Sequence, residues 1–234
     1  MLLDTQWDVA SLAANIDQYL NSIPDGAWPV WILGSHDKPR IASKIGIEQA
    51  RVAAMLLFTL PRTPIFYAGD EIGMPNVEIP PERVRDPFER LVPGHGLNRD
   101  PERTPMGWDA GENAGFTSEE PWVPIGDQIE DRNVASQLED DRSILWLYRR
   151  LIALRQHEPA LIAGRFEPQR SQGDVLLFER RLKCSRLVVA FNVSDREQEV
   201  KIRGEYRGPI STHLDHAMET AESILRLRRI RVLF

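Results

Sequence analysis

Apolar residues recur at helical spacing in three stretches of the chain, residues 7–20, 46–60 and 142–156. In each stretch they fall three or four positions apart, which places them on one face of a helix. Pro61 follows the second stretch, and Gly164 follows a short continuation of the third. Proline and glycine both end helices, so the pattern predicts three amphipathic helices.

Two short apolar runs, residues 28–34 and 63–69, alternate with the first two helices. Such runs are typical of strands that are buried on both faces of a parallel sheet. Polar residues follow at once: residues 35–40 follow the first run, and Asp70 and Glu71 follow the second. Since α/β proteins place their chemistry beyond the carboxyl ends of parallel strands, these two loops are candidate sites.

A long segment without periodicity, residues 75–140, follows the second strand. It is rich in Pro, Gly, Asp, Glu and Asn, with scattered aromatic residues. Loops of this length in compact proteins are usually functional, so we expect this one to contribute to a site.

The last third of the chain has the pattern of an antiparallel β-sandwich. We place the boundary near residues 161–166. This gives an α/β domain over 1–162, which includes the long loop, and a β-sandwich domain over 163–234. The predicted strands cover residues 175–180, 187–192, 199–203 and 225–233.

The composition excludes several classes of function. The chain has 234 residues, 42% of them hydrophobic, and a net charge of −6, which disfavours nucleic acid as a partner. Cys184 is the single cysteine, so a disulfide framework and a multi-cysteine metal site are excluded. No apolar run approaches the ~20 residues of a membrane span, and the N-terminus lacks the features of a signal peptide. We therefore expect a soluble, cytoplasmic protein with no membrane partner.

His36 and Asp37, after the first strand, can grip neighbouring hydroxyl groups. A neutral histidine donates to one hydroxyl while a carboxylate accepts from another, and a carboxylate also stabilises positive charge developing on a carbon. On its own, a His-Asp pair more often belongs to a polar loop in which the histidine caps the next helix. The His-Asp metal pair of phosphohydrolases is rejected, because it lies on a helix and needs an upstream histidine that this chain lacks.

Two further polar segments admit structural as well as chemical roles. We expect Asp70 and Glu71 to fix their loop through arginine or backbone N–H groups. Within residues 99–109, Arg103 has a fork of donors that can hold a hydroxyl or a carboxylate, and Trp108 can stack against a flat apolar face. Generic physics alone would make this segment a solvated, salt-bridged loop.

In this order and spacing, the three segments resemble the α-amylase superfamily of glycoside hydrolases (family 13), and most closely its α-glucosidase and oligo-1,6-glucosidase branch. The first resembles the Asn-His-Asp region after barrel strand seven, the second the strand-eight region, and the third the Arg-Thr-Pro-Met-x-Trp segment of that branch. The tail resembles the family's C-terminal β-sandwich. The segments are Trp31-Ile32-Leu33-Gly34-Ser35-His36-Asp37-Lys38-Pro39-Arg40, Thr63-Pro64-Ile65-Phe66-Tyr67-Ala68-Gly69-Asp70-Glu71-Ile72-Gly73-Met74 and Arg103-Thr104-Pro105-Met106-Gly107-Trp108-Asp109.

The resemblance implies a fold and a set of roles. The fold is the last part of a (β/α)₈ TIM barrel, about two strands and three helices with a long loop after strand eight, followed by the antiparallel β-sandwich. Asp37 would be the transition-state stabiliser, and His36 and Arg103 would contact the same sugar. Arg40 would support the loop or bind a second sugar. Ser35 stands where the family usually has Asn, which removes one amide donor from the loop.

The resemblance also implies what lies outside these residues. A retaining glycosidase needs a nucleophile and a general acid about 5–5.5 Å apart, and in this family both come from strands four and five. By this alignment the sequence starts at helix six. We therefore expect a C-terminal fragment of a retaining α-glucosidase that acts on small oligosaccharides and is inactive alone. Its partners would be a small α-glucoside and a missing N-terminal barrel portion, with no cofactor and no metal.

Two alternatives share these motifs. One is a fragment of a glucosyltransferase or isomerase of the same superfamily, of the trehalose or isomaltulose synthase type, which product analysis would distinguish. The other is a non-enzymatic amylase-like interaction module, which would bind a partner and no sugar.

Overall fold

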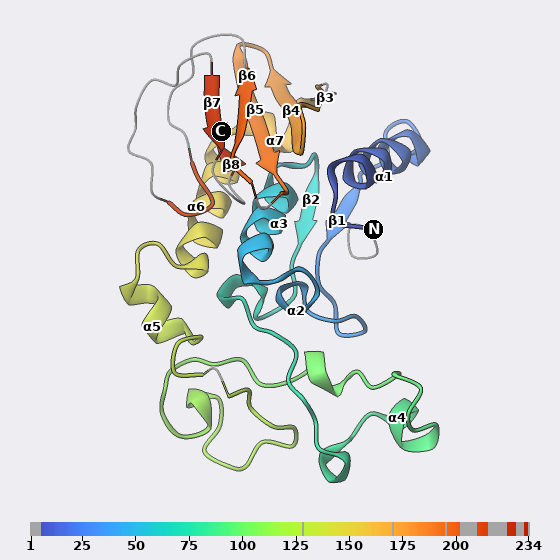
Figure 1. Cartoon of the computed structure of the whole chain (residues 1–234), viewed down its shortest axis with the longest axis vertical. Coiled ribbons are helices and arrows are strands. Elements are labelled where there is room, and N and C mark those ends of the chain that lie inside the picture. Colours follow the sequence, from blue (N-terminus) through green and yellow to red (C-terminus); the bar gives the residue numbers. More distant parts are fainter. Residues whose placement is uncertain are drawn as a thin grey trace. The chain divides into compact units, whose positions relative to one another are not determined.

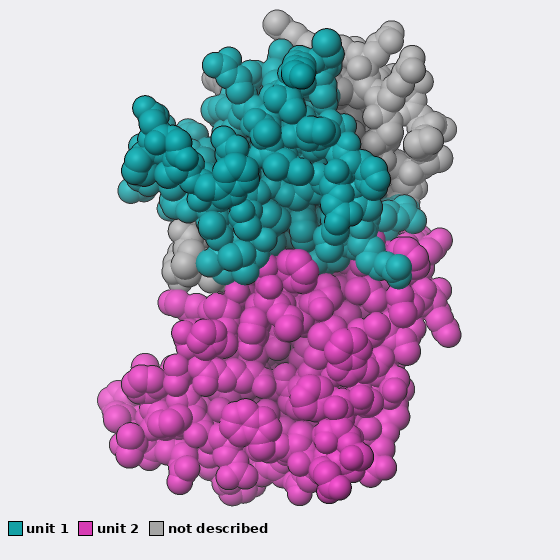
Figure 2. Space-filling view, turned by 180° about the vertical axis from the view of Figure 1, so that it is seen from behind, with its two compact units in different colours: residues 1–33, 51–65, 147–234 teal, residues 34–50, 66–146 magenta. Residues whose placement is uncertain are grey.

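The structure is a computed structural model that describes residues 6–127, 129–169, 171–194, 196–201, 210–214, 224–227 and 232–233. It divides into two compact units, coloured separately in Figure 2. Unit 1 comprises Met1–Leu33, Arg51–Ile65 and Leu147–Phe234, and unit 2 comprises Gly34–Ala50 and Phe66–Trp146. The predicted domain boundary between residues 162 and 163 stays a prediction.

Helix α1, Val9–Ser22, confirms the first predicted helix. It begins at Asp8, whose carboxylate accepts a hydrogen bond from the Ser11 N–H at 2.9 Å and so satisfies one of the unpaired donors of the first turn. Leu12 and Ile16, four residues apart on one face, are buried.

Strands β1 (Val30–Ile32) and β2 (Thr63–Ile65) pair in parallel, as the alternation of helices and strands predicts (Figure 1). The predicted burial of both strands on both faces is wrong, because Val30 is 37% exposed and Ile65 is 43% exposed. A parallel strand is fully buried only when other elements cover both of its faces, and the described sheet that holds β1 and β2 has these two strands alone.

The second predicted helix, over residues 46–60, is confirmed as helix α3, and a short helix that was not predicted precedes it. Helix α2, Ile41–Ile45, ends at Gly46, whose φ of 80° lies in the left-handed region. Glycine adopts this conformation without steric cost, and helix α3, Ile47–Thr59, continues from there. The sequence did not reveal α2. Residues 52–58 of α3 are all buried.

Buried arginines cap the carboxyl end of α3. Arg155, on helix α6 (Ile144–His157), donates to the carbonyls of Phe58 and Leu60 at 2.6 and 3.2 Å. Arg180 donates to the Thr59 carbonyl at 2.7 Å. Cations at this end of a helix satisfy carbonyls that have no partner within it and match the negative end of the helix dipole.

The third predicted helix is confirmed as α6, and its continuation is helix α7, Pro159–Ala163, which ends at Gly164. Helix α7 packs against two strands of the C-terminal part, β4 (Val175–Leu182) and β5 (Ser185–Asn192). Arg180, on β4, also donates to the carbonyls of Leu161 and Gly164 at 3.0 and 2.9 Å.

The C-terminal strands pair in antiparallel fashion, as predicted. A four-stranded sheet has the order β3-β4-β5-β8, with β3 at Arg165–Pro168 and β8 at Val232–Leu233. A separate pair joins β6 (Gln198–Lys201) to β7 (Ile224–Leu227). The sequence did not reveal β3, and the other residues of the two last predicted strands lie outside the described ones. The packing of two sheets into a sandwich stays a prediction.

The 3₁₀ turn η2 (Asp70–Ile72) precedes the long loop of unit 2. The described residues of the loop form only short elements, which are the 3₁₀ turns η3 (Pro81–Arg83), η4 (Asp100–Glu102) and η5 (Glu112–Gly115) and the helices α4 (Pro87–Leu91) and α5 (Val134–Glu139). The expectation of a largely irregular segment over 75–140 is therefore confirmed.

A buried carboxylate, Asp70, fixes the loop after β2. It accepts from the Tyr67 N–H at 3.0 Å, and a methyl group added at Gly34 would lie 2.5 Å from its Oδ2 atom. Glu71 accepts from the Gly69 N–H at 2.7 Å. The expected role of these two acids, to hold their own loop through backbone N–H groups, is confirmed. Burial raises the pKa of Asp70 to about 6, although the nearby Arg40 opposes the shift.

We predict that Arg180→Ala lowers the free energy of unfolding by about 3 kcal/mol or more, because it leaves three buried carbonyls without a donor. Urea denaturation followed by circular dichroism measures the change. Arg165→Ala, at an exposed arginine on the neighbouring strand β3, is the matched control and should stay near the wild-type value. Equal losses for the two variants would contradict the capping role.

We predict a pH-dependent effect of Asp70→Asn. The folded chain holds the Asp70 proton up to a pH of about 6, whereas the unfolded chain releases it near 3.8. The wild-type free energy of unfolding should therefore fall relative to the variant as the pH rises from about 4 to 6, by about 3 kcal/mol in all. Urea denaturation at several pH values tests this, with the exposed Asp131→Asn as control. Parallel profiles for wild type and Asp70→Asn would refute it.

Candidate functional site

Asp37 lies in a tight turn after β1 that Ser35 closes. The Ser35 hydroxyl accepts a hydrogen bond from the Asp37 N–H at 3.2 Å, and Ser35 forms an isolated β-bridge with Lys38. A hydroxyl that accepts from the N–H two residues ahead is a recognised turn device. Ser35 therefore holds the His-Asp loop through its hydroxyl, which accepts from the Asp37 N–H.

Three polar side chains contact the Asp37 carboxylate. Its Oδ1 atom lies 3.0 Å from Nη1 of Arg99 and 3.1 Å from Nη2 of Arg103. Its Oδ2 atom lies 3.1 Å from Nε2 of His36. The Asp37 side chain is still 48% exposed, so the carboxylate is held and yet open to a ligand.

These contacts keep Asp37 ionised. Partial burial by itself raises the pKa of the Asp37 carboxyl, but the hydrogen bond from Arg99 and the charges of His36, Arg99 and Arg103 together outweigh it. The pKa of Asp37 therefore lies below its ordinary value. A carboxylate that is charged and fixed is suited to stabilise a cationic transition state.

Arg103 joins the two residues of the His-Asp pair. Besides its contact with Asp37, it donates from Nε to the His36 carbonyl at 2.9 Å. The structure thus brings together three of the four residues singled out from the sequence, namely His36, Asp37 and Arg103. Trp108, in the same motif as Arg103, is 49% exposed.

Arg40, the fourth of these residues, is buried and contacts the loop after β2. Its Nη1 donates to the Ala68 carbonyl at 2.8 Å, and its guanidinium lies 4.9 Å from the centre of the Tyr67 ring. Its backbone N–H donates to Asn76 at 2.8 Å. Burial lowers the pKa of Arg40, and the nearby carboxylates oppose the shift. These contacts match the loop-supporting alternative, and a second-sugar contact stays a prediction.

Sequence reasoning missed two residues of this site, Arg99 and Asp86. Arg99 begins the motif that contains Arg103, but only Arg103 was assigned a role. Asp86 stands before Pro87 and caps helix α4 by accepting from the Phe88 N–H at 3.0 Å. An acid followed by proline is a typical helix start, which could have placed the helix but not its connection to Asp37.

A hollow of about 310 Å³ opens beside Asp37 in unit 2. A carboxylate, an arginine and an amide together can bind a molecule with several hydroxyl groups, and an aromatic ring can stack on its apolar face. The lining residues are Asp37, Pro39, Asn76, Phe88, Gly96, Leu97, Asn98, Arg99 and Glu102.

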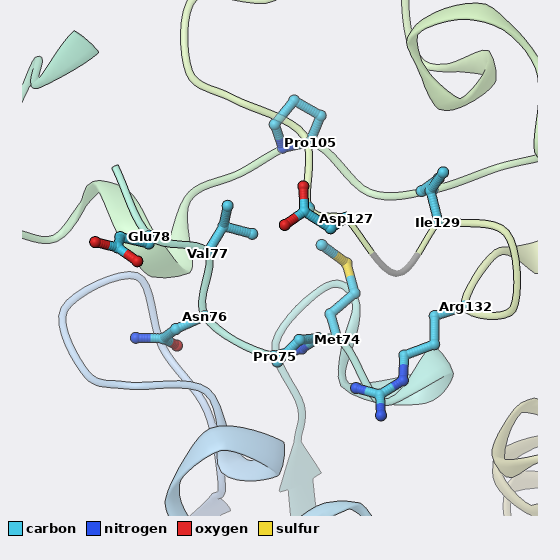
Figure 3. A pocket seen from close by; sticks show the side chains of 11 residues that line it. Met74, Pro75, Asn76, Val77, Glu78, Pro105, Asp127, Ile129 and Arg132 are labelled. Atoms are coloured by element: carbon cyan, nitrogen blue, oxygen red, sulfur yellow. The ribbon is translucent and has the colours of Figure 1, made fainter. Parts of the chain in front are cut away.

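A second hollow of unit 2, of about 140 Å³, has none of the predicted site residues in its wall (Figure 3). Apolar side chains, among them Met74, Pro105 and Ile129, share its wall with Glu78 and Arg132.

Within the described residues of the structure, no three or more His, Cys, Asp or Glu side chains are arranged to hold a metal ion. In the same part of the chain, no helix is both long and apolar enough to cross a membrane.

The chain is 31% identical to the oligo-1,6-glucosidase of Parageobacillus thermoglucosidasius, with 81% of the chain and 38% of that enzyme covered. It is 34% identical to the trehalose-6-phosphate hydrolase of Escherichia coli (strain K12), with 86% and 41% covered. The amino acid transporter heavy chain SLC3A1 of Homo sapiens is 34% identical, with 71% and 23% covered. The chain thus spans well under half the length of these relatives.

Solved structures match more of the chain. An alpha-glucosyl transfer enzyme, XgtA, superposes with a TM-score of 0.86 at 28% identity, covering 99% of this chain and 44% of the enzyme. The trehalulose synthase MutB from Pseudomonas mesoacidophila MX-45 gives 0.85 at 25% identity, covering 97% and 46%.

A family model described as "Alpha amylase, catalytic domain" matches residues 3–164. This match contains the β1–α3–β2 unit, the His36–Asp37 turn and the loop that carries Arg99 and Arg103. It makes the parallel strands part of a TIM barrel, as predicted. The chain therefore belongs to the alpha-amylase family of glycoside hydrolases.

Proposed function

We propose that this chain supplies the sugar-binding half of the catalytic centre of an enzyme acting on α-glucosidic bonds in small oligosaccharides. The observation that carries this proposal is the Asp37 carboxylate, which two arginines and His36 hold in a charged and accessible state. The glucosidases among its relatives support the choice of substrate class.

Asp37 acts on the charge that develops when the glycosidic bond breaks. The transition state of this reaction resembles an oxocarbenium ion, and a fixed carboxylate nearby lowers its energy without having to reorganise. His36 and Arg103 bind hydroxyl groups of the same sugar, and Arg40 keeps the neighbouring loop in place.

The cytoplasmic location expected from the sequence stays a prediction.

The other half of the centre comes from residues outside these 234. Bond cleavage with retention requires a nucleophile and a general acid, and the carboxylates around Asp37 do not offer such a pair. Glu102 is buried and accepts a hydrogen bond from Nδ2 of Asn76 at 3.3 Å, and the Asp86 carboxylate accepts hydrogen bonds from Arg99 and from the Phe88 N–H. We propose that a further barrel portion provides both groups.

A second candidate is glucosyl transfer or isomerisation at the same centre. The superposition with a glucosyl transfer enzyme and a trehalulose synthase supports it. The Asp37 cluster serves hydrolysis and transfer equally, since both pass through the same cationic transition state.

A third candidate is the interaction module without sugar affinity that the sequence analysis left open. The similarity of the chain to the amino acid transporter heavy chain supports it.

We predict that a chimera becomes an α-glucosidase. Residues 1–234 replace the matching segment of the oligo-1,6-glucosidase of Parageobacillus thermoglucosidasius, and release of p-nitrophenol from its α-glucoside is measured. Asp37→Asn should lower kcat by about 100- to 1,000-fold, because the fixed negative charge is lost. Asp131→Asn makes the same change at an exposed site and should leave kcat unchanged.

The 234-residue chain alone should release no p-nitrophenol. If the chain alone releases p-nitrophenol and Asp37→Asn abolishes this release, the proposal that the nucleophile and the general acid come from a further barrel portion is overturned. A folded chimera whose activity is indifferent to Asp37→Asn would overturn the role of Asp37.

Product analysis separates hydrolysis from transfer. With sucrose or maltose as substrate, a hydrolase chimera releases free glucose in proportion to the bonds broken. Chromatography that instead finds isomeric disaccharides as the main products would favour the transfer alternative and reject hydrolysis.

A further inference from the structure

Asp86 is a buried carboxylate whose hydrogen bonds go almost entirely to one residue. Its Oδ2 atom accepts from the backbone N–H of Arg99 at 2.8 Å and from Nε of Arg99 at 2.7 Å. Its Oδ1 atom accepts from Nη2 of Arg99 at 3.1 Å and from the Phe88 N–H at 3.0 Å. Arg99 therefore provides three of the four donors.

This arrangement fixes the plane of the Arg99 guanidinium. Two of its nitrogens are engaged in a fork with Asp86, and the pair is rigid because a bidentate arginine–carboxylate contact restricts both groups. The guanidinium also lies 4.7 Å from the centre of the Phe88 ring. Its remaining nitrogen, Nη1, is directed at Asp37 Oδ1 at 3.0 Å.

The Asp86–Arg99 ion pair does not titrate near neutral pH. The hydrogen bond from Arg99 is the largest influence on the pKa of Asp86 and holds it far below the usual value, while burial opposes the shift. The same pairing raises the pKa of Arg99. Both groups stay charged at neutral pH.

Asp37 needs such a support because its own turn is exposed. Its side chain is half exposed, and its contact with His36 is to the neighbouring residue of the same exposed turn. Arg103 contacts the turn at the His36 carbonyl and at Asp37. Arg99 differs from both because its guanidinium is also held by a second, buried carboxylate, that of Asp86.

We propose that Asp86 is a positioning residue, which orients Arg99 and through it fixes the Asp37 carboxylate for catalysis. This inference rests on the proposed function for its catalytic consequence. The physical coupling of Asp86 to Asp37 is a property of the chain itself, so it can be measured without turnover.

The first test uses the 234-residue chain. The pKa of Asp37 is measured by carbon-13 NMR titration of its carboxyl in the wild type, in Asp86→Asn and in Arg99→Ala. Asparagine keeps the cap on helix α4 but loses the charge that holds Arg99. The pKa of Asp37 should rise by about one pH unit in Arg99→Ala and by a similar amount in Asp86→Asn. An Asp37 pKa in Asp86→Asn that equals or falls below the wild-type value would overturn the proposal, since Arg99 would then reach Asp37 without Asp86.

Two further variants serve as an alternative test and as a control. Arg99→Lys retains the positive charge but lacks the several donors of a guanidinium, so it cannot bridge the carboxylates of Asp86 and Asp37. It should also raise the pKa of Asp37, and it replaces Asp86→Asn in the test if that variant does not fold. Glu120→Gln is the matched control. Glu120 forms an ion pair with Arg83 in the same loop, and its loss should leave the Asp37 pKa at the wild-type value.

The second test uses the chimera. Asp86→Asn should lower kcat about 10- to 100-fold, as expected for a misplaced catalytic group, with KM changed less than about threefold. In the Arg99→Ala background the same substitution should have no further effect, because Asp86 acts through Arg99. Additive losses would overturn the inference. A chimera without Asp37-dependent activity would refute the proposed function alone, since the NMR titration still decides the inference.

Discussion

The candidate site depends on one shared atom, Oδ1 of Asp37, which accepts from Arg99 and Arg103. These arginines lie more than 60 residues further along the chain, in a loop that has little regular structure of its own. An irregular segment holds its shape only if polar groups inside it are paired. Here the buried Asp86 provides that pairing, so the order of the loop and the orientation of Asp37 have a common cause.

Unit 1 uses buried charge in a different way. Arg155 and Arg180 donate to backbone carbonyls at the end of α3. Burial lowers the pKa of Arg180 to about 9, helped by the charges of Arg155 and Arg62. A buried guanidinium is costly unless its donors are satisfied. Several carbonyls that converge on one place pair with Nη1 and Nη2 of Arg180, and the arginine in return fixes where α3 ends.

Periodicity was sufficient to locate α1, α3, α6, β4 and β5, because burial of one face imposes a regular pattern on the sequence. It failed for α2 and β3, which are too short to show a period. It also misjudged the burial of β1 and β2, since an apolar run does not specify how many neighbours a strand has. The motifs identified His36, Asp37 and Arg103, but contacts such as Arg99 with Asp86 depend on the path of an irregular loop. No spacing rule encodes that path.

The Asp37 cluster does not by itself decide between hydrolysis and glucosyl transfer. A fixed carboxylate with arginine and histidine partners stabilises positive charge on a sugar whatever molecule attacks next. Under the proposed function, water and a sugar hydroxyl attack a sugar that is held by the same Asp37, which agrees with the similarity of the chain to both an oligo-1,6-glucosidase and an alpha-glucosyl transfer enzyme. The choice between them must depend on how water is admitted or excluded. Phe88 and Leu97, which line the hollow beside Asp37, come from the long loop. Under the proposed function, the loop that supplies Arg99 and Arg103 to the charge cluster therefore also supplies the apolar walls that limit the access of water.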